Sequence, residues 1–172
     1  MKLSWQILKL QLKETFAIAY GNYDFREALL LSLSKNGETG YGECTAINYY
    51  NINLQDFDLK LKAIQNKIER HKIESPYAFS EFLFSLQIHP FLQSALDCAF
   101  WDLFGKLEKK SFFDIAKIPN ATTLQSSITI SIDSVEKQIE KITNSNWTNF
   151  KVKCKDYDEE QLELLANLPQ KI

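Results

Sequence analysis

The pattern of apolar residues changes twice along this 172-residue chain, and these changes constrain its fold more than any other feature. Residues 1–45 alternate apolar and polar positions in short stretches, which predicts an antiparallel meander of three strands. After residue 55 the apolar spacing becomes helical, and from residue 123 the pattern is strand, helix, strand, helix. The last pattern is typical of parallel α/β folds, because parallel strands need a crossover between them. We therefore predict a domain boundary near residue 120.

The meander contains one clear tight turn and one longer connection. Asn36-Gly37 supplies the positive φ angles that a tight hairpin needs, so it should join the second and third strands. The stretch FAIAYGNYDF (16–25), between the first and second strands, is predicted to be a loop of about ten residues. In the third strand, Gly40 and Gly42 would let another backbone approach closely.

Three helices are predicted between residues 55 and 106. The first carries a helical stripe of apolar residues, Phe57, Leu61, Ile64 and Ile68. The second covers SPYAFSEFLFSL (75–86), with a proline in its first turn. The third starts at Pro90 and ends at Gly105, and its apolar residues surround most of its circumference. We expect this third helix to be a central, buried element.

Composition argues against several classes of protein. The net charge is −2, with acidic and basic residues interspersed, so no basic stripe suggests nucleic-acid binding. Hydrophobic residues make up 45% and charged residues 24% of the chain, as in soluble globular proteins. The N-terminus lacks the apolar core of a signal peptide, and no run of about 18 apolar residues could span a membrane.

The three cysteines, Cys44, Cys98 and Cys154, are far apart and form no CxxC pair. This spacing argues against a disulfide framework or a zinc site. We expect reduced, buried thiols in a cytoplasmic protein.

Residues 123–172 hold two strand–helix pairs. A strand is predicted over TLQSSITISI (123–132), followed by a capping-box start at 133–136 and a helix with Val135, Ile139 and Ile142 on one face. The second strand is FKVKC (150–154), and a helix with an acidic first turn follows it. Two such units alone cannot close a barrel or cover both faces of a parallel sheet.

Lys151 and Lys153 lie two residues apart in the second of these strands, and therefore on the same face. One interpretation is that they protect an exposed edge strand. The other is that they point into a site, because a strand between helices is normally covered on both faces. Two neighbouring positive charges favour a neutral lysine, which can act as a general base. Lys153 would also lie at the carboxyl end of its strand, where parallel βα structures place their active sites.

Four stretches of the chain resemble the enolase superfamily, in particular its muconate-lactonizing-enzyme-like subgroup and, within it, the dipeptide (L-Ala-D/L-Glu) epimerases. GYGE (40–43) is similar to the third strand of the capping domain, and SALDCAFWDLFGK (94–106) to the family's A-x-D-x-A-x-W-D-x-x-G-K helix. ITISI (128–132) is similar to the first barrel strand, and FKVK (150–153) to the Lys-x-Lys motif of the second. Lys155 stands where the family commonly has a glycine.

The resemblance implies a fold of two parts. Residues 1–120 would form an N-terminal α+β capping domain, with the three-stranded antiparallel meander plus helices. Residues 121–172 would form the first two βα units of an enolase-type (β/α)7β TIM-like barrel, which this chain truncates.

The resemblance also implies roles for individual residues. Lys153 would be the catalytic lysine that removes or returns the proton α to a carboxylate, with Lys151 beside it, favouring its neutral form and touching the substrate carboxylate. Thr129 would contact the substrate, although it could equally be an ordinary strand threonine. Tyr20, in the loop expected to close over the substrate, would influence specificity or be an ordinary exposed aromatic. Asp97 and Asp102 would be structural helix residues.

In the family, the metal ligands and a second acid/base lysine lie on later barrel strands. Mg²⁺ is therefore expected in the complete enzyme, with no metal ligand in this chain. The implied function is a metal-dependent isomerase, an epimerase or racemase that acts on a dipeptide such as L-Ala-L-Glu, with no activity expected from the 172-residue chain alone.

Two alternatives stay open. The same scaffold could perform o-succinylbenzoate synthase or muconate-type cycloisomerase chemistry, or the chain could be a catalytically inactive truncated module. The expected partner is a small-molecule carboxylate substrate, with no nucleic acid and no membrane, and homo-oligomerisation stays open.

Overall fold

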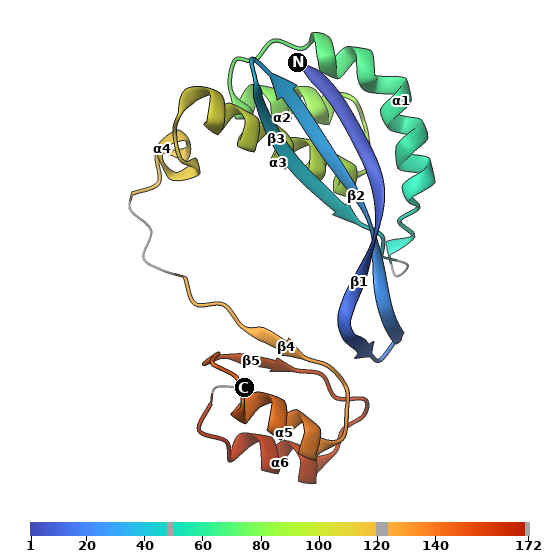
Figure 1. Cartoon of the computed structure of the whole chain (residues 1–172), viewed down its shortest axis with the longest axis vertical. Coiled ribbons are helices and arrows are strands. Elements are labelled where there is room, and N and C mark those ends of the chain that lie inside the picture. Colours follow the sequence, from blue (N-terminus) through green and yellow to red (C-terminus); the bar gives the residue numbers. More distant parts are fainter. Residues whose placement is uncertain (48–49, 120–123, 171–172) are drawn as a thin grey trace. The chain divides into compact units, whose positions relative to one another are not determined.

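The computed structural model describes residues 1–47, 50–119 and 124–170. Its elements in chain order (Figure 1) are β1 (Lys2–Ile18), β2 (Gly21–Lys35), β3 (Glu38–Thr45), α1 (Leu54–Arg70), α2 (Pro76–Ser85), α3 (Pro90–Glu108), α4 (Phe112–Ala116), β4 (Ile128–Ile130), α5 (Val135–Thr143), β5 (Phe150–Val152) and α6 (Glu159–Ala166). None of the helices in these three ranges has both the length and the hydropathy of a membrane-spanning segment.

Contacts divide the chain into two compact units. The first unit comprises Met1–Leu10 and Arg26–Asn120, and the second comprises Gln11–Phe25 and Ala121–Ile172. The end of the β1–β2 hairpin therefore groups with the segment that holds β4 and β5. The boundary predicted near residue 120 falls on residues outside the described ranges.

β1, β2 and β3 form one antiparallel sheet in that order, as the meander pattern predicts. β2 and β3 pair from Ala28 opposite Thr45 to Lys35 opposite Glu38. The turn between them is Asn36-Gly37, with φ angles of +51° and +85°. Positive φ at both central positions is the geometry that a two-residue hairpin requires, so the predicted turn is confirmed.

The prediction of a long loop over residues 16–25 is wrong. β1 continues to Ile18 and β2 begins at Gly21, so a two-residue turn joins them. The Thr15 hydroxyl donates to Asp24 Oδ1 across the hairpin at 2.6 Å. The β-branched and aromatic residues of this stretch favour extended structure, and Gly21, with φ +148°, provides the backbone conformation that the turn needs.

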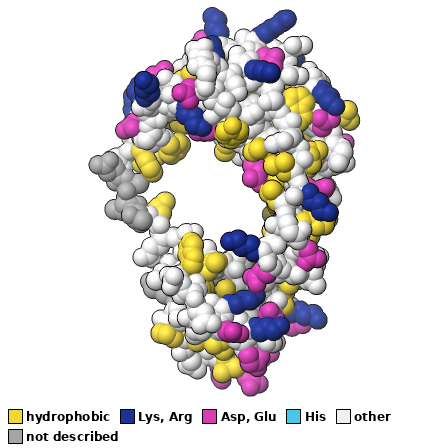
Figure 2. All heavy atoms as spheres, in the orientation of Figure 1, with side chains coloured by type: hydrophobic (Ala, Val, Ile, Leu, Met, Phe, Trp, Pro, Cys, Tyr) yellow, Lys and Arg dark blue, Asp and Glu magenta, His cyan; other side chains and the backbone are white. Residues whose placement is uncertain are grey.

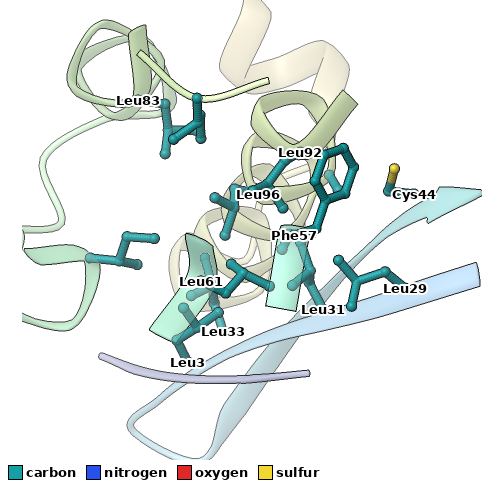
Figure 3. Close-up of a cluster of buried hydrophobic side chains, with 14 of the residues drawn as sticks. Leu3, Leu29, Leu31, Leu33, Cys44, Phe57, Leu61, Leu83, Leu92 and Leu96 are labelled. Atoms are coloured by element: carbon teal, nitrogen blue, oxygen red, sulfur yellow. The ribbon is translucent and has the colours of Figure 1, made fainter. Parts of the chain in front are cut away.

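The first unit buries its core between the sheet and helices α1, α2 and α3 (Figure 3). Leu29, Leu31 and Leu33, at alternate positions of β2, are fully buried. α1 buries its predicted apolar stripe, Phe57, Leu61, Ile64 and Ile68. The buried residues of α3 are Leu92, Ala95, Leu96, Ala99, Phe100 and Leu103. The third predicted helix is therefore the central one, as expected.

α3 continues past its predicted end at Gly105. It ends at Glu108, and Lys109 adopts the left-handed conformation (φ +53°) that closes the helix. The Lys110 N–H donates to the Gly105 carbonyl at 2.9 Å. A Cβ on Gly105 would lie 3.0 Å from the Lys110 carbonyl oxygen. Gly105 thus makes room for the chain that folds back after the helix and does not itself end it.

β3 lies directly against α3 because two of its residues have no side chain. A Cβ on Gly40 would lie 2.2 Å from the Ala99 carbonyl oxygen, and one on Gly42 would lie 1.9 Å from the Ala95 carbonyl oxygen. Real Cβ atoms do not come this close to backbone atoms, so only glycine fits at either position. The predicted close approach is confirmed, and the approaching backbone is that of α3.

Polar contacts fix the register of the same two elements. Asp102 Oδ2 accepts a hydrogen bond from the Tyr41 N–H at 2.9 Å and pairs with Lys106 Nζ at 2.7 Å. Lys106 Nζ also donates to the Thr39 carbonyl at 2.7 Å. These contacts give Asp102 a structural role, because they join α3 to β3 at Thr39 and Tyr41, the residues on either side of Gly40.

In the second unit, β4 and β5 form a parallel pair, as the strand–helix pattern predicts. α5 and α6 cover one face of the pair, where Ile130 and Phe150 pack with Ile142 and Leu165. β4 comprises only three residues of the strand predicted over 123–132, whose first residue lies outside the described ranges.

The capping box predicted at the start of α5 is not formed. Ser134 is the N-cap residue, but its side chain makes no capping hydrogen bond. Its N–H donates instead to Asp133 Oδ1 at 2.9 Å, and Lys137 Nζ lies 3.3 Å from the same oxygen. The hydrogen bond from the Ser134 N–H, helped by Lys137 and Lys141, holds the pKa of Asp133 below its usual range.

The end of the β1–β2 hairpin contacts the segment between β4 and α5. The Ile132 N–H donates to the Ala17 carbonyl at 3.0 Å. Lys141 Nζ pairs with Glu14 Oε2 at 2.9 Å and lies 3.8 Å from Asp133 Oδ2. Lys141 therefore bridges the hairpin and the segment that precedes α5.

Gly42→Ala is expected to lower the free energy of unfolding by about 3 kcal/mol or more, because the added Cβ would overlap the α3 backbone. Gly37→Ala is the matched control. No atom lies within 4 Å of its Cβ, and only its positive φ would be strained, which costs about 1 kcal/mol. Urea denaturation of both variants measures the difference, and equal losses would contradict the close approach of β3 to α3.

Lys141→Ala is expected to weaken the contact of the hairpin with Ile132 by less than about 1 kcal/mol, since the Lys141 and Glu14 side chains are both partly exposed. The Ile132 amide should exchange faster with deuterium in this variant, and added salt should reduce the difference. Lys137→Ala is the control, because it removes an ion pair with Asp133 that does not involve the hairpin. This variant should leave the exchange rate of the Ile132 amide nearly unchanged. An unchanged rate with Lys141→Ala would mean that the ion pair does not hold the hairpin.

Candidate active site

Three of the predicted site residues lie on one face of the β4–β5 pair. Thr129 and Lys151 are register partners, and Lys153 follows Lys151 by two residues. Because side chains alternate along a strand, all three point away from the face where Ile130 and Phe150 pack against the helices. Lys151 is exposed, while Thr129 and Lys153 are half-buried. The structure therefore brings these three residues together.

Lys153 is the first residue after β5, at the carboxyl end of the parallel pair. Its N–H donates to the Ile130 carbonyl at 2.9 Å, and its carbonyl accepts from Gln138 Nε2 at 2.9 Å. Within the described residues β5 pairs only with β4, so Lys151 also lies on an edge strand. Both interpretations of the lysine pair, edge protection and catalysis, fit this geometry.

Tyr20 lies in the turn of the β1–β2 hairpin rather than in a long loop, and 76% of its surface is exposed. Ala17, three residues earlier, accepts the hydrogen bond from Ile132. Ile132 lies two residues after β4, the strand that carries Thr129. The hairpin end is thus attached near the carboxyl end of β4.

Gln138, on α5, is a residue that sequence analysis missed. The predicted buried face of this helix was Val135, Ile139 and Ile142, but Gln138 is also fully buried and Val135 is only partly so. Its amide contacts the backbone of Lys153. A signal was present in the sequence, because a glutamine four residues before Ile142 falls on the apolar stripe of the helix.

The described residues contain no group of three or more His, Cys, Asp or Glu side chains that could hold a metal ion. The three cysteines are free thiols. The expectation of buried thiols is wrong for Cys98, which is exposed. Burial raises the pKa of the Cys44 thiol to about 11, with a further contribution from the Glu43 carboxylate.

The first unit has a cavity of about 700 Å³ along α3, lined by residues that include Asp97, Trp101 and Phe112. Burial raises the pKa of the Asp97 carboxyl, although a hydrogen bond with Trp101 opposes the shift. Acidic and basic side chains are interspersed over the face shown in Figure 2. The cavity belongs to a different compact unit from the lysine pair.

No family model matches the chain. The chain is 33% identical over 153 residues to an L-Ala-D/L-amino acid epimerase from Maribacter sp., covering 89% of this chain and 45% of that protein. It is 30% identical over 174 residues to the protein of the same name from Flavobacterium johnsoniae, covering 98% and 50%. An o-succinylbenzoate synthase from Listeria innocua is 26% identical over 129 residues, covering 72% and 34%. The chain spans about half the length of the two epimerases it matches.

Solved structures share the fold. An enolase family member from Agrobacterium tumefaciens, with homology to dipeptide epimerases and with bound sodium and L-Ala-L-Glu, has a TM-score of 0.82 at 20% identity, covering 98% of this chain and 51% of that one. The dipeptide epimerase from Enterococcus faecalis, complexed with Mg and L-Leu-L-Tyr, has a TM-score of 0.75 at 18% identity, covering 89% and 45%.

The sequence relatives and structural neighbours are proteins of the kind that the four sequence motifs resemble. The meander with its helices corresponds to the capping domain, and the β4–β5 pair with α5 and α6 to the first two βα units of the barrel. The chain is therefore similar in sequence to L-Ala-D/L-amino acid epimerases, and it shares its fold with solved structures of the enolase superfamily, dipeptide epimerases among them.

Proposed function

We propose that the protein to which these residues belong is an epimerase that moves the proton α to the carboxylate of a dipeptide such as L-Ala-L-Glu, with Lys153 as one acid/base catalyst. The observation that carries this proposal is the position of Lys153 at the carboxyl end of β5, on the face away from α5 and α6. The relatives named L-Ala-D/L-amino acid epimerases support this class of reaction.

In the proposed reaction, the neutral amine of Lys153 takes the α-proton, so that an N–H bond forms as the C–H bond breaks. The electron pair of the C–H bond moves into the carboxylate, and the α-carbon becomes planar. A second acid then returns a proton to the opposite face, which inverts the configuration at this carbon. Lys151, on the same face of β5, would place its positive charge beside the carboxylate where negative charge develops.

Two further residues are proposed to contact the substrate. Thr129 is the register partner of Lys151, so its hydroxyl lies beside the lysine pair. Tyr20, exposed in the hairpin turn, is the proposed specificity residue. The attachment of the hairpin through Ala17 and Ile132 supports this role, because it holds the turn near the carboxyl end of β4.

We propose Mg²⁺ as the cofactor of the whole enzyme, because the E. faecalis neighbour was solved with Mg and a dipeptide. The described residues do not fit a metal site, so no ligand is assigned among them.

An o-succinylbenzoate synthase is a second candidate, favoured by the similarity to the Listeria innocua protein of that name. In that reaction Lys153 would also remove an α-proton, but a β-elimination would follow. The two candidates share the lysine and differ in the substrate.

Lys153→Ala is expected to lower the exchange of the α-proton of L-Ala-L-Glu by about 10³-fold, as is typical when a general acid/base group is removed. The measurement is ¹H NMR of the dipeptide in D₂O with the natural protein and Mg²⁺. Lys155→Ala is the matched control, because this exposed lysine follows β5 by three residues, and its exchange rate should stay within about twofold of the original.

Three results would contradict the proposal. Equal exchange after Lys153→Ala would mean that another group is the base. Dehydration of the o-succinylbenzoate precursor without dipeptide exchange would favour the second candidate. If the unaltered protein acts on neither compound, the alternative of a catalytically inactive module would hold.

A further inference from the structure

We propose that Gln138 is a positioning residue for Lys153, an inference that rests on the proposed role of Lys153 as the acid/base catalyst. Gln138 lies on α5 and is 0% exposed. Its Nε2 donates two hydrogen bonds, one to the Ser131 carbonyl and one to the Lys153 carbonyl, each at 2.9 Å. Its Oε1 accepts from Gln161 Nε2 of α6 at 2.7 Å. The three hydrogen bonds use both donors and the acceptor of the amide.

The two carbonyls occupy equivalent places in the parallel pair. β4 ends at Ile130 and β5 ends at Val152, so Ser131 and Lys153 are the first residues beyond the paired stretch. Carbonyls at this point no longer take part in the ladder between β4 and β5, yet Ser131 is buried. A primary amide has two N–H donors and can satisfy both carbonyls at once, whereas a hydroxyl has only one.

The consequence for Lys153 is a backbone held on both sides of its Cα. Its N–H donates to the Ile130 carbonyl at 2.9 Å, and its carbonyl is held by Gln138. These two hydrogen bonds restrain the peptide planes before and after the Lys153 Cα, and so they fix the direction of its Cα–Cβ bond. The Lys153 Nζ atom lies at the end of a flexible side chain, so the direction of the Cα–Cβ bond decides which region the amine can reach. A misplacement of about 1 Å can slow a reaction by about 100-fold.

Gln161 orients the amide. A glutamine side chain can be turned over so that its oxygen and nitrogen exchange places, and only one arrangement presents donors to both carbonyls. The Gln161 Nε2 donor faces Gln138 Oε1 and favours that arrangement. A chain of hydrogen bonds thus runs from α6 through α5 to the backbone of Lys153.

The test compares Gln138→Met with Ile142→Ala in the natural protein. Methionine keeps the length of the side chain and removes both donors. Ile142 is also fully buried on α5, but it packs in the apolar cluster and does not bond to Lys153, so its variant reports a loss of stability alone. For dipeptide epimerisation, Gln138→Met should lower kcat by about 10- to 100-fold with KM within about threefold. At temperatures well below its Tm, Ile142→Ala should keep kcat within about twofold.

A second readout does not need epimerase activity. Competitive acetylation followed by mass spectrometry gives the labelling rate of Lys153 relative to Lys155 in the same molecule. Gln138→Met should change this ratio at least twofold by releasing the Lys153 backbone, and Ile142→Ala should leave it unchanged. Gln161→Leu, which alters a side chain that is only partly buried, should change it in the same direction as Gln138→Met. Gln161→Leu decides the question if the Gln138→Met protein does not fold.

Epimerase activity and the labelling ratio of Lys153 test the proposed function and the role of Gln138 separately. If the unaltered protein epimerises the dipeptide and Lys153→Ala abolishes the activity, equal kcat values for Gln138→Met and Ile142→Ala would overturn the positioning role. If the unaltered protein has no epimerase activity, the proposed function fails, and the labelling ratio alone decides whether Gln138 positions Lys153. An unchanged ratio in both glutamine variants would overturn the inference.

Discussion

The first compact unit depends on the close approach of β3 to α3. Gly40 and Gly42 lack the Cβ atoms that would otherwise overlap the carbonyl oxygens of Ala99 and Ala95. The contact explains two motifs at once: the glycines of GYGE and the alanines of the helix motif are the two sides of one interface. With this distance set, the leucines of β2 and the apolar faces of α1 and α2 can close a single core around α3.

The second unit depends on the parallel pairing of β4 with β5. This pairing places Thr129 beside Lys151 and brings Lys153 to the carboxyl end of the pair, while α5 and α6 bury the opposite face. The same helices contribute more than apolar cover, because Gln138 and Gln161 extend a hydrogen-bond network to the Lys153 backbone. The backbone of the proposed catalytic lysine is thus supported by a polar network centred on the buried Gln138 amide.

Three features with local sequence signals were predicted correctly. The stripe on α1, the Asn36-Gly37 turn and the encircling apolar residues of α3 each depend on spacing within one element. The capping box predicted at 133–136 failed for a local reason, because the Ser134 N–H bonds to the adjacent Asp133. Two other failed predictions depend on partners that the local pattern does not include. The stretch 16–25 pairs across a hairpin, and Gly105 accommodates the chain that folds back after α3. Local turn signals do not record such partners.

The sequence by itself determined the order of elements, the resemblance to the enolase superfamily and the lysines that share a strand face, because strand and helix periods and motif spacing are properties of the chain alone. Only the tertiary structure decided which backbone lies against Gly40 and Gly42, that the stretch around Tyr20 is a hairpin, and that Gln138 holds the carbonyl of Lys153. Each of these depends on atoms that are distant in sequence and meet only when the elements pack. A buried amide between two strand ends is therefore visible in the fold and not in the periodicity.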